Sequence, residues 1–84
     1  MVKINRELER QIKEQPERSF DLIVRTNDDA TPHLSWLTAA GLQVRQQFKL
    51  TPGVAVSGAG QDVLKLLEQT WVLSIELDAP VKTM

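Results

Sequence analysis

The sequence predicts a small α+β domain, with strands and helices in the order β-α-β-β-α-β after an N-terminal helix. Segments in which apolar and polar residues alternate, as in half-buried strands, are separated by segments with helical apolar spacing. Two strand-like segments, residues 42–50 and 54–56, are joined by a tight Thr51-Pro52-Gly53 turn. With 84 residues, the chain has the length of one domain with a modest core.

The composition argues against several classes of function. The chain has no cysteine and one histidine, so we expect no disulfide, no metal site and no cofactor. The net charge of −1 gives no electrostatic basis for binding nucleic acid. No apolar run approaches the roughly 20 residues of a membrane span, and the N-terminus lacks the apolar segment of a signal peptide. We therefore expect no membrane contact, and a cytoplasmic location if the chain is complete as given.

Residues 1–18 are expected to form a peripheral amphipathic helix. Ile4, Leu8 and Ile12 recur every four residues and give one apolar stripe. Asn5 is a suitable N-cap, and Pro16 ends the helix.

The next segments predict a central strand and a capped helix. Phe20–Thr26 is apolar on both faces, as expected inside a sheet. Thr31 is a suitable N-cap, Pro32 suits a first turn, and Gly41 suits a left-handed C-terminal position. The apolar residues of this helix are Leu34, Trp36, Leu37 and Ala40.

The second half of the chain predicts two further strands, a second helix and a last strand. Leu42–Leu50 alternates, with Val44, Gln46 and Phe48 on its apolar side, and predicts an edge strand. A short strand at residues 54–56 and a helix at residues 61–69 follow. Trp71–Asp78 predicts the last strand. We expect Trp71, Leu73, Ile75 and Leu77 on its buried face, and Val72, Ser74, Glu76 and Asp78 on the other.

With right-handed crossovers, these elements form a ferredoxin-like antiparallel sheet over residues 19–78. The first and third strands are then central, and the second and fourth are edges. Both helices cover one face, so the other face stays open. Residues 79–84 form an extended C-terminal tail, because Pro80 prevents further regular pairing.

No catalytic group stands out, so we predict that the chain is not an enzyme. His33 lies early in a helix beside Asp28 and Asp29, where a capping or solvated role is expected. The glycine-rich residues 57–60 lack the lysine of a phosphate-binding loop. Glu76 and Asp78 are more informative, because residues two apart on a strand point the same way. Either they keep an edge strand soluble, or they accept hydrogen bonds from a partner's helix N-termini.

The chain resembles the subtilisin propeptides and their stand-alone relatives, the I9 type of peptidase inhibitor. The resemblance spans nearly the whole chain, and its motifs are mostly hydrophobic spacing. The matching residues are Leu22-Ile23-Val24-Arg25, His33-Leu34-x-Trp36-Leu37, Ala40-Gly41, Val44, Phe48-Lys49-Leu50-x-Pro52-Gly53-Val54-Ala55, Val63-Leu64-x-Leu66, Trp71-Val72 and Ile75-Glu76-x-Asp78 with six residues after it.

This resemblance implies a subtilisin-like serine protease as the partner. The open sheet face would pack on two surface helices of the protease, and Glu76 and Asp78 would cap their N-termini. The tail would lie in the substrate cleft like a cleaved product. A prosegment produced separately from its enzyme would also assist folding of the protease. Met84 would fill the main specificity pocket and Val81 an apolar pocket. The tail residues are Pro80, Val81, Lys82, Thr83 and Met84.

Other hypotheses about the function remain open. No protease domain is present in the sequence, so the chain is either a free-standing inhibitor or a separately produced prosegment. The alternative class is a ferredoxin-like module that binds a small ligand or associates with itself. RNA binding is disfavoured because Phe20 is the one aromatic residue in the two central strands. We expect a monomer when the chain is free. Loss of residues 81–84 should leave the alternative module unaffected and disable an inhibitor.

Overall fold

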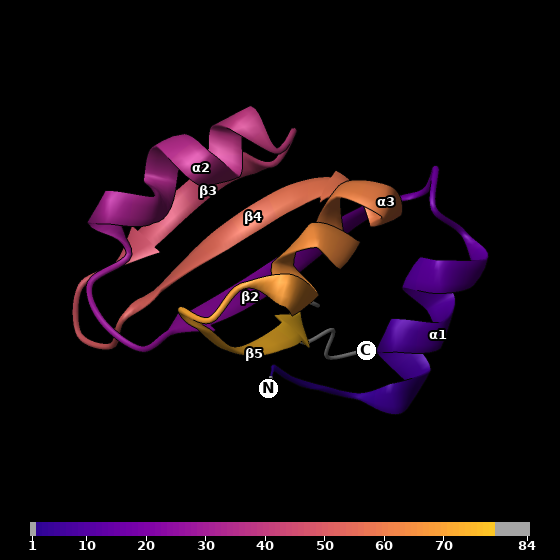
Figure 1. The fold of residues 1–84 in the computed structure, drawn as a ribbon, viewed down its shortest axis with the longest axis horizontal. Coiled ribbons are helices and arrows are strands. Elements are labelled where there is room, and N and C mark those ends of the chain that lie inside the picture. Colours follow the sequence, from indigo (N-terminus) through magenta and orange to yellow (C-terminus); the bar gives the residue numbers. More distant parts are fainter. Residues whose placement is uncertain (1, 79–84) are drawn as a thin grey trace, which may run out of the picture.

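The computed structural model describes residues 2–78 and is a small α+β domain built on a five-stranded mixed sheet (Figure 1). The neighbour order in the sheet is β1-β5-β2-β4-β3. The strands are β1 (Lys3–Ile4), β2 (Ser19–Thr26), β3 (Gln43–Phe48), β4 (Gly53–Ala59) and β5 (Val72–Leu77). The helices are α1 (Arg6–Glu14), α2 (Leu34–Ala39) and α3 (Gly60–Val63), and the short 3-10 segments are η1 (Thr31–His33) and η2 (Leu64–Glu68). Among residues 2–78, no helix has the length and apolar character needed to cross a membrane.

Strands β2 and β4 lie inside the sheet, as the sequence predicted for the first and third strands of the main domain. Their antiparallel register runs from Ser19 opposite Ala59 to Arg25 opposite Gly53. Strand β4 is longer than expected, because residues 57–59 continue the strand instead of forming a loop. The largest fully buried side chains are Ile12, Leu22, Leu37, Leu66, Ile75, Val24, Val54, Val56 and Val63.

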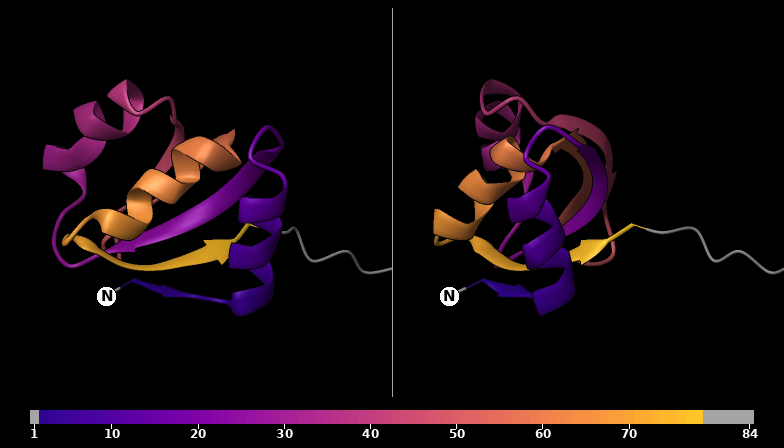
Figure 2. Two further views of the ribbon diagram at one scale, coloured as in Figure 1. Left: turned by 45° about the vertical axis from the view of Figure 1, so that its right-hand side comes forward. Right: turned by 90° about the vertical axis from the view of Figure 1, so that its right-hand side faces the viewer.

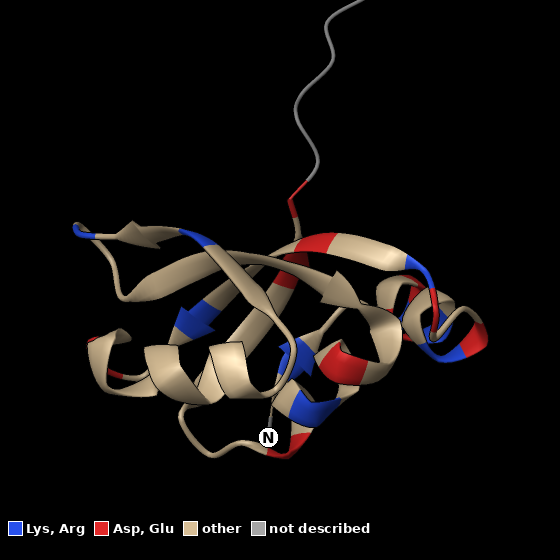
Figure 3. Cartoon of the chain, turned by 90° about the horizontal axis from the view of Figure 1, so that it is seen from above, with Lys and Arg blue, Asp and Glu red and all other residues tan. Residues whose placement is uncertain are grey.

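Helices α2 and α3 lie on one face of the sheet, and no helix formed by residues 2–78 lies on the opposite face (Figures 2 and 3). The even-numbered side chains of β2, from Phe20 to Thr26, are buried toward the helices. The odd-numbered ones lie on the other face, because successive side chains of a strand alternate. We call this second surface the open face. Its presence was predicted from the sequence.

The N-terminal segment differs from the prediction. Ile4 does not belong to the helix but to β1, which pairs in parallel with β5 through Lys3 opposite Ser74 and Ile4 opposite Ile75. The helix begins after Asn5, whose side-chain Oδ1 accepts the backbone N–H groups of Glu7 and Leu8 at 2.8 and 3.3 Å. The sheet is therefore mixed rather than antiparallel, and β5 is not an edge strand.

The predicted faces of β5 were also partly wrong. Ile75 and Leu77 lie opposite Val24 and Leu22 on the helix side, as predicted, although Leu77 is about half exposed. Val72 is buried and Leu73 is about half exposed, the reverse of the prediction. The cause of this reversal is an irregularity in the β2–β5 register: Arg25 lies opposite Ser74, but Thr26 lies opposite Val72. Leu73 is thus an extra residue, and it reverses the alternation on its N-terminal side.

A second irregularity lies in β3. Val44 pairs with Val56 and Gln46 with Ala55, so Arg45 is the extra residue. Before the bulge, Val44 faces the helices, as predicted. After it, Gln46 and Phe48 lie on the open face instead of the predicted inner face. Leu50, expected on that inner face as the end of the strand, lies in the turn and is 99% exposed.

The helix expected from Thr31 is divided into η1 and α2. Thr31 is the first residue of η1 and Ala30 has the N-cap position, so the side chain that stabilises the start of η1 is that of Asp29, one residue earlier. The Asp29 Oδ1 atom accepts the Thr31 N–H at 3.0 Å, the Thr31 hydroxyl at 2.8 Å and the Gln47 amide at 3.1 Å. Gly41 ends the helical region with φ of +98°, the left-handed geometry predicted for it.

The hydrogen bonds of Asp29 predict that the stability of η1 depends on pH. The Thr31 N–H and then its hydroxyl lower the pKa of Asp29, with a smaller effect from Gln47. Its stabilising effect on the fold is therefore present above the pKa of an unfolded aspartate and lost as the pH falls through the lowered folded-state pKa. We expect the carboxyl carbon of Asp29 in an NMR titration to titrate below the range of an ordinary aspartate, and Gln47→Ala to move this midpoint slightly upward. A titration midpoint in the range of an ordinary aspartate would contradict the hydrogen-bonding role of Asp29 at the start of η1.

Candidate docking face and sheet-edge hollow

The open face has a small apolar centre. Ile23 of β2, Ala55 of β4 and Phe48 of β3 lie on it, and Ala55 is only 3% exposed although none of the described helices covers this face. The Phe48 ring lies close to Gly53, since an added Cβ on Gly53 would meet Phe48 Cδ2 at 3.3 Å. Small residues on β4 let the longer side chains of the neighbouring strands cover the centre. A partner would meet a shallow, partly apolar surface here.

Charged residues also occur along the strands of this sheet, as the coloured ribbon shows (Figure 3). Glu76 lies opposite Ile23, and Asp78 follows the same register, with its N–H donating to the Asp21 carbonyl at 2.9 Å. Both carboxylates therefore lie on the open face, as predicted, although β1 has taken the edge position from β5.

Each carboxylate has an arginine partner that the sequence analysis missed. The Arg45 Nη2 atom donates to the Asp78 Oδ2 atom at 2.8 Å, and their side chains are 36% and 32% exposed. Arg25 Nε lies 3.9 Å from Glu76 Oε1, with side chains 40% and 56% exposed. The first pair is a charge-assisted hydrogen bond, and the second is a long, solvated ion pair. Opposite charges on strands of the same sheet were the sequence signal, since alternation from Gln43 and Val44 already places Arg45 on the open face and the bulge reverses only the residues after it.

This arrangement determines what the carboxylates can do. Each retains acceptor capacity, because an ionised carboxylate accepts about four hydrogen bonds. Arg45 orients the Asp78 carboxylate by a direct hydrogen bond, whereas Arg25 makes only a long contact with Glu76. Glu76 is the more accessible acceptor, and Asp78 is the more firmly held one.

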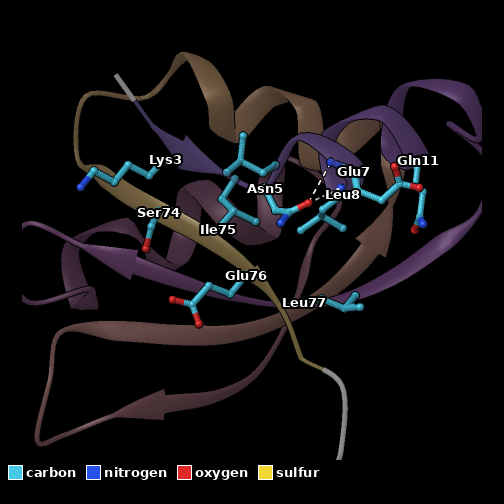
Figure 4. A pocket seen from close by; sticks show the side chains of 10 residues that line it. Lys3, Asn5, Glu7, Leu8, Gln11, Ser74, Ile75, Glu76 and Leu77 are labelled. Atoms are coloured by element: carbon cyan, nitrogen blue, oxygen red, sulfur yellow. Dashed lines mark hydrogen bonds between the residues drawn. The ribbon is translucent and has the colours of Figure 1, made fainter.

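A second surface lies at the sheet edge, between α1 and β5 (Figure 4). Because β1 pairs only as far as Ile75, no described strand covers the outer edge of Glu76 and Leu77. A hollow of about 650 Å³ lies at this point. It is lined by Lys3, Ile4, Asn5, Glu7, Leu8, Gln11, Ser74, Ile75, Glu76 and Leu77.

Two polar groups of the hollow already have partners within the protein. Asn5 caps α1 through its side-chain oxygen. Glu7 accepts the Arg10 guanidinium at 2.6 Å, which lowers the pKa of this carboxyl. The hollow is thus mainly a contact surface of apolar residues with a polar rim.

The remaining predicted residues have other positions. The His33 ring stacks on Trp71 with centroids 4.1 Å apart and an interplanar angle of 5°, and Trp36 meets Trp71 edge-on at 5.4 Å. This is a packing contact between the start of α2 and the start of β5. The predicted tail residues Pro80, Val81, Lys82, Thr83 and Met84 lie outside the described residues. Within residues 2–78, no group of three or more histidine and acidic side chains is placed to hold a metal ion.

We compared the chain with protein-family models, with curated proteins and with solved structures, and none of the three comparisons gave a match. The function is therefore inferred from the open face, its charges and the sequence that follows β5.

Proposed function

We propose that the chain is an inhibitor of the subtilisin-propeptide type, which docks on a serine protease by its open face and inserts residues 79–84 into the substrate cleft like a product. We also propose that β2 to β5 with α2 and α3 form a ferredoxin-like unit, to which β1 and α1 are added. The neighbour order β5-β2-β4-β3 and the helices on one face support this second point.

One observation carries the inhibitor proposal. Two carboxylates, Glu76 and Asp78, lie on a sheet face that no described helix covers and that has an apolar centre, immediately before the Pro80-containing residues 79–84. Ionised acceptors on a flat, partly apolar surface suit helix N-termini, whose unpaired N–H groups and dipole attract negative charge. The tail sequence has apolar residues at Val81 and Met84, which suit a cleft that binds extended peptides by strand addition.

The direct experiment is a titration of a subtilisin-type protease with the full chain, followed by the rate of hydrolysis of a small substrate. Stoichiometric, reversible loss of activity would support the proposal. Full activity with a large molar excess of the chain, across several proteases of this type, would refute it.

The carboxylates give a more specific prediction. Glu76→Gln is expected to raise the inhibition constant about tenfold, because a hydrogen bond to a charged acceptor contributes about 1.5–3 kcal/mol, part of which remains with the amide. Asp78→Asn should have an effect of similar size. Glu68→Gln makes the same change on η2, on the helix side of the sheet, and should leave the inhibition constant unchanged. Equal constants for Glu76→Gln and Glu68→Gln would exclude Glu76 from the interface.

The hollow beside β5 favours a second candidate function, binding of a small apolar ligand. Leu77 is about half exposed there, and Ile4, Leu8 and Ile75 line the same space. A ligand-binding module should be indifferent to removal of residues 81–84, whereas an inhibitor should not. If the chain is a ligand-binding module, Leu77→Asp should abolish binding of an apolar ligand in the hollow.

A further inference from the structure

The backbone groups of β5 alternate in the direction of their hydrogen bonds. The Asp78 N–H donates to the Asp21 carbonyl of β2 at 2.9 Å. In an antiparallel pair, every second residue exchanges its N–H and C=O bonds with the partner strand, and the residues between them direct both groups away from it. Asp78 and Glu76 are therefore the residues that bond to β2. Ile75 and Leu77 direct their N–H and C=O groups toward the outer edge of β5.

At Leu77, these two backbone groups have no partner among residues 2–78. Strand β1 pairs with Ile75 through Ile4, and the chain then turns at Asn5 into α1. No described backbone hydrogen bond outside the strand ladders involves Leu77. An unpaired strand edge is a template for pairing with another chain. Because Asn5 lies directly before this point, the free edge is short and suits an added strand that exchanges its two bonds with Leu77.

The side chains around this edge differ between the two sides of the sheet. Leu77 lies opposite Leu22, so its half-exposed side chain is on the helix side. Leu8 of α1 lines the hollow on that side (Figure 4). Lys3 and Glu76, which carry opposite charges, line the hollow from the side of the open face. The hollow thus has an apolar wall toward α1 and a charged rim on the other side.

These groups favour a peptide over other apolar ligands. A ligand without hydrogen-bonding groups would displace water from the N–H and C=O of Leu77 and leave both unpaired, which costs free energy. An extended peptide replaces that water by one donor and one acceptor, as in strand addition. A second copy of the chain is less suited, because α1 flanks the edge and the free strand is small beside the area of about 1,000 Å² that a stable interface buries.

We propose that the hollow binds an extended peptide segment of a partner protein, which pairs antiparallel with Leu77 and directs an aliphatic side chain toward Leu8. This inference rests on the ligand-binding function proposed for the hollow and names its class of ligand; it does not depend on the inhibitor proposal. Residues directly opposite each other in an antiparallel pair have their side chains on the same face. The residue paired with Leu77 therefore faces α1, and its neighbours in the peptide face the charged rim, where polar residues are expected.

The test is an NMR titration of the full, isotope-labelled chain with acetyl-leucine N-methylamide, which has one aliphatic side chain between two peptide groups. We expect binding in the millimolar range, with a downfield shift of the Leu77 amide proton as it gains an acceptor. The same molecule methylated on its leucine nitrogen lacks the donor for the Leu77 carbonyl and should bind about tenfold more weakly. Equal binding of the two molecules, or no response of the Leu77 amide, would overturn the proposal.

A pair of variants tests the apolar contact. Leu77→Ala should weaken binding of acetyl-leucine N-methylamide about fivefold, because less apolar surface is buried beside the paired residue. Leu73→Ala is the matched control, since Leu73 is also about half exposed on β5 but does not line the hollow. It should leave binding unchanged, and an equal loss in both variants would refute the proposed position of the peptide.

Isopentyl alcohol separates this inference from the function on which it rests, because it has the leucine side chain but no peptide group. If it binds as tightly as the amide, the hollow is a plain apolar site and the peptide class is wrong. If neither molecule binds, the ligand-binding function fails as well. A Leu77 amide signal that shifts with the concentration of the chain alone would identify a second copy as the occupant and would also overturn the proposal.

Discussion

Removal of Val81–Met84 is expected to raise the inhibition constant of the chain toward a subtilisin-type protease by about 100- to 1000-fold. Val81 and Met84 are the two apolar side chains proposed to enter pockets of the cleft. Full burial of each contributes about 1.5–3 kcal/mol, and the main-chain pairing of the segment is lost with them. Ordering the tail offsets part of this gain, which keeps the expected change near three orders of magnitude or below. Inhibition kinetics with a small substrate measure the change directly.

The control for this truncation lies within the tail itself. Lys82 is expected to point outward from the cleft, so Lys82→Ala should change the inhibition constant less than threefold, the scale of a solvent-exposed side chain. Met84→Ala should account for a large part of the truncation effect. If the truncated chain inhibits as well as the full chain, the product-like mechanism is wrong and the open face alone is the inhibitory surface.

The two proposed contact surfaces differ in how far the sequence could predict them. Alternation placed Glu76 and Asp78 on one face correctly, because their stretch of β5 has a regular register with β2. It failed for Val72 and Phe48, since the extra residue in β5 reverses the side chain before it and the extra residue in β3 reverses those after it. Bulges depend on how two strands fit together, and neither strand contains that information alone.

In the N-terminal segment, too, the sequence did not predict a pairing between residues that are distant along the chain. The four-residue spacing correctly predicted that Leu8 and Ile12 share an inward face. It also included Ile4, which has the right spacing but lies in β1, because the free edge of β5 offers backbone hydrogen bonds to an extended Lys3–Ile4 segment. Asn5 lies between the strand and the helix, and its role as the N-cap of α1 was predicted from the sequence.

Helix α1, which follows the paired strand β1, is part of the main hydrophobic core. The sequence suggested a peripheral helix, but Leu8 and Ile12 belong to the same hydrophobic cluster as Leu22 and Leu66. The Ile12 carbonyl would lie only 2.9 Å from a Cβ added to Gly60, so the backbones of α1 and α3 are close together. Strand β1 and helix α1 therefore hold β5 from its outer side. The position of β5 then depends on the N-terminal residues as well as on β2.

Ile12→Ala is accordingly expected to lower the free energy of unfolding by about 2–4 kcal/mol, the range for truncating a fully buried aliphatic side chain. Ile12 is 0% exposed, and the close approach of the α1 and α3 backbones leaves little freedom for the cavity to collapse. A domain of this length has a total stability of roughly 4–12 kcal/mol, so the loss is a large part of it. Urea denaturation followed by the fluorescence of Trp36 and Trp71 reports this change.

Leu50→Ala provides the matched control, because it removes a similar aliphatic side chain that is 99% exposed. It should change the free energy of unfolding by less than about 0.5 kcal/mol. Since α1 and the main sheet share one core, Ile12→Ala should shift the midpoint of a single transition rather than add a second one. A loss below about 1 kcal/mol, or a separate early transition, would mean that α1 is the peripheral helix suggested by its sequence and that β5 is held without it.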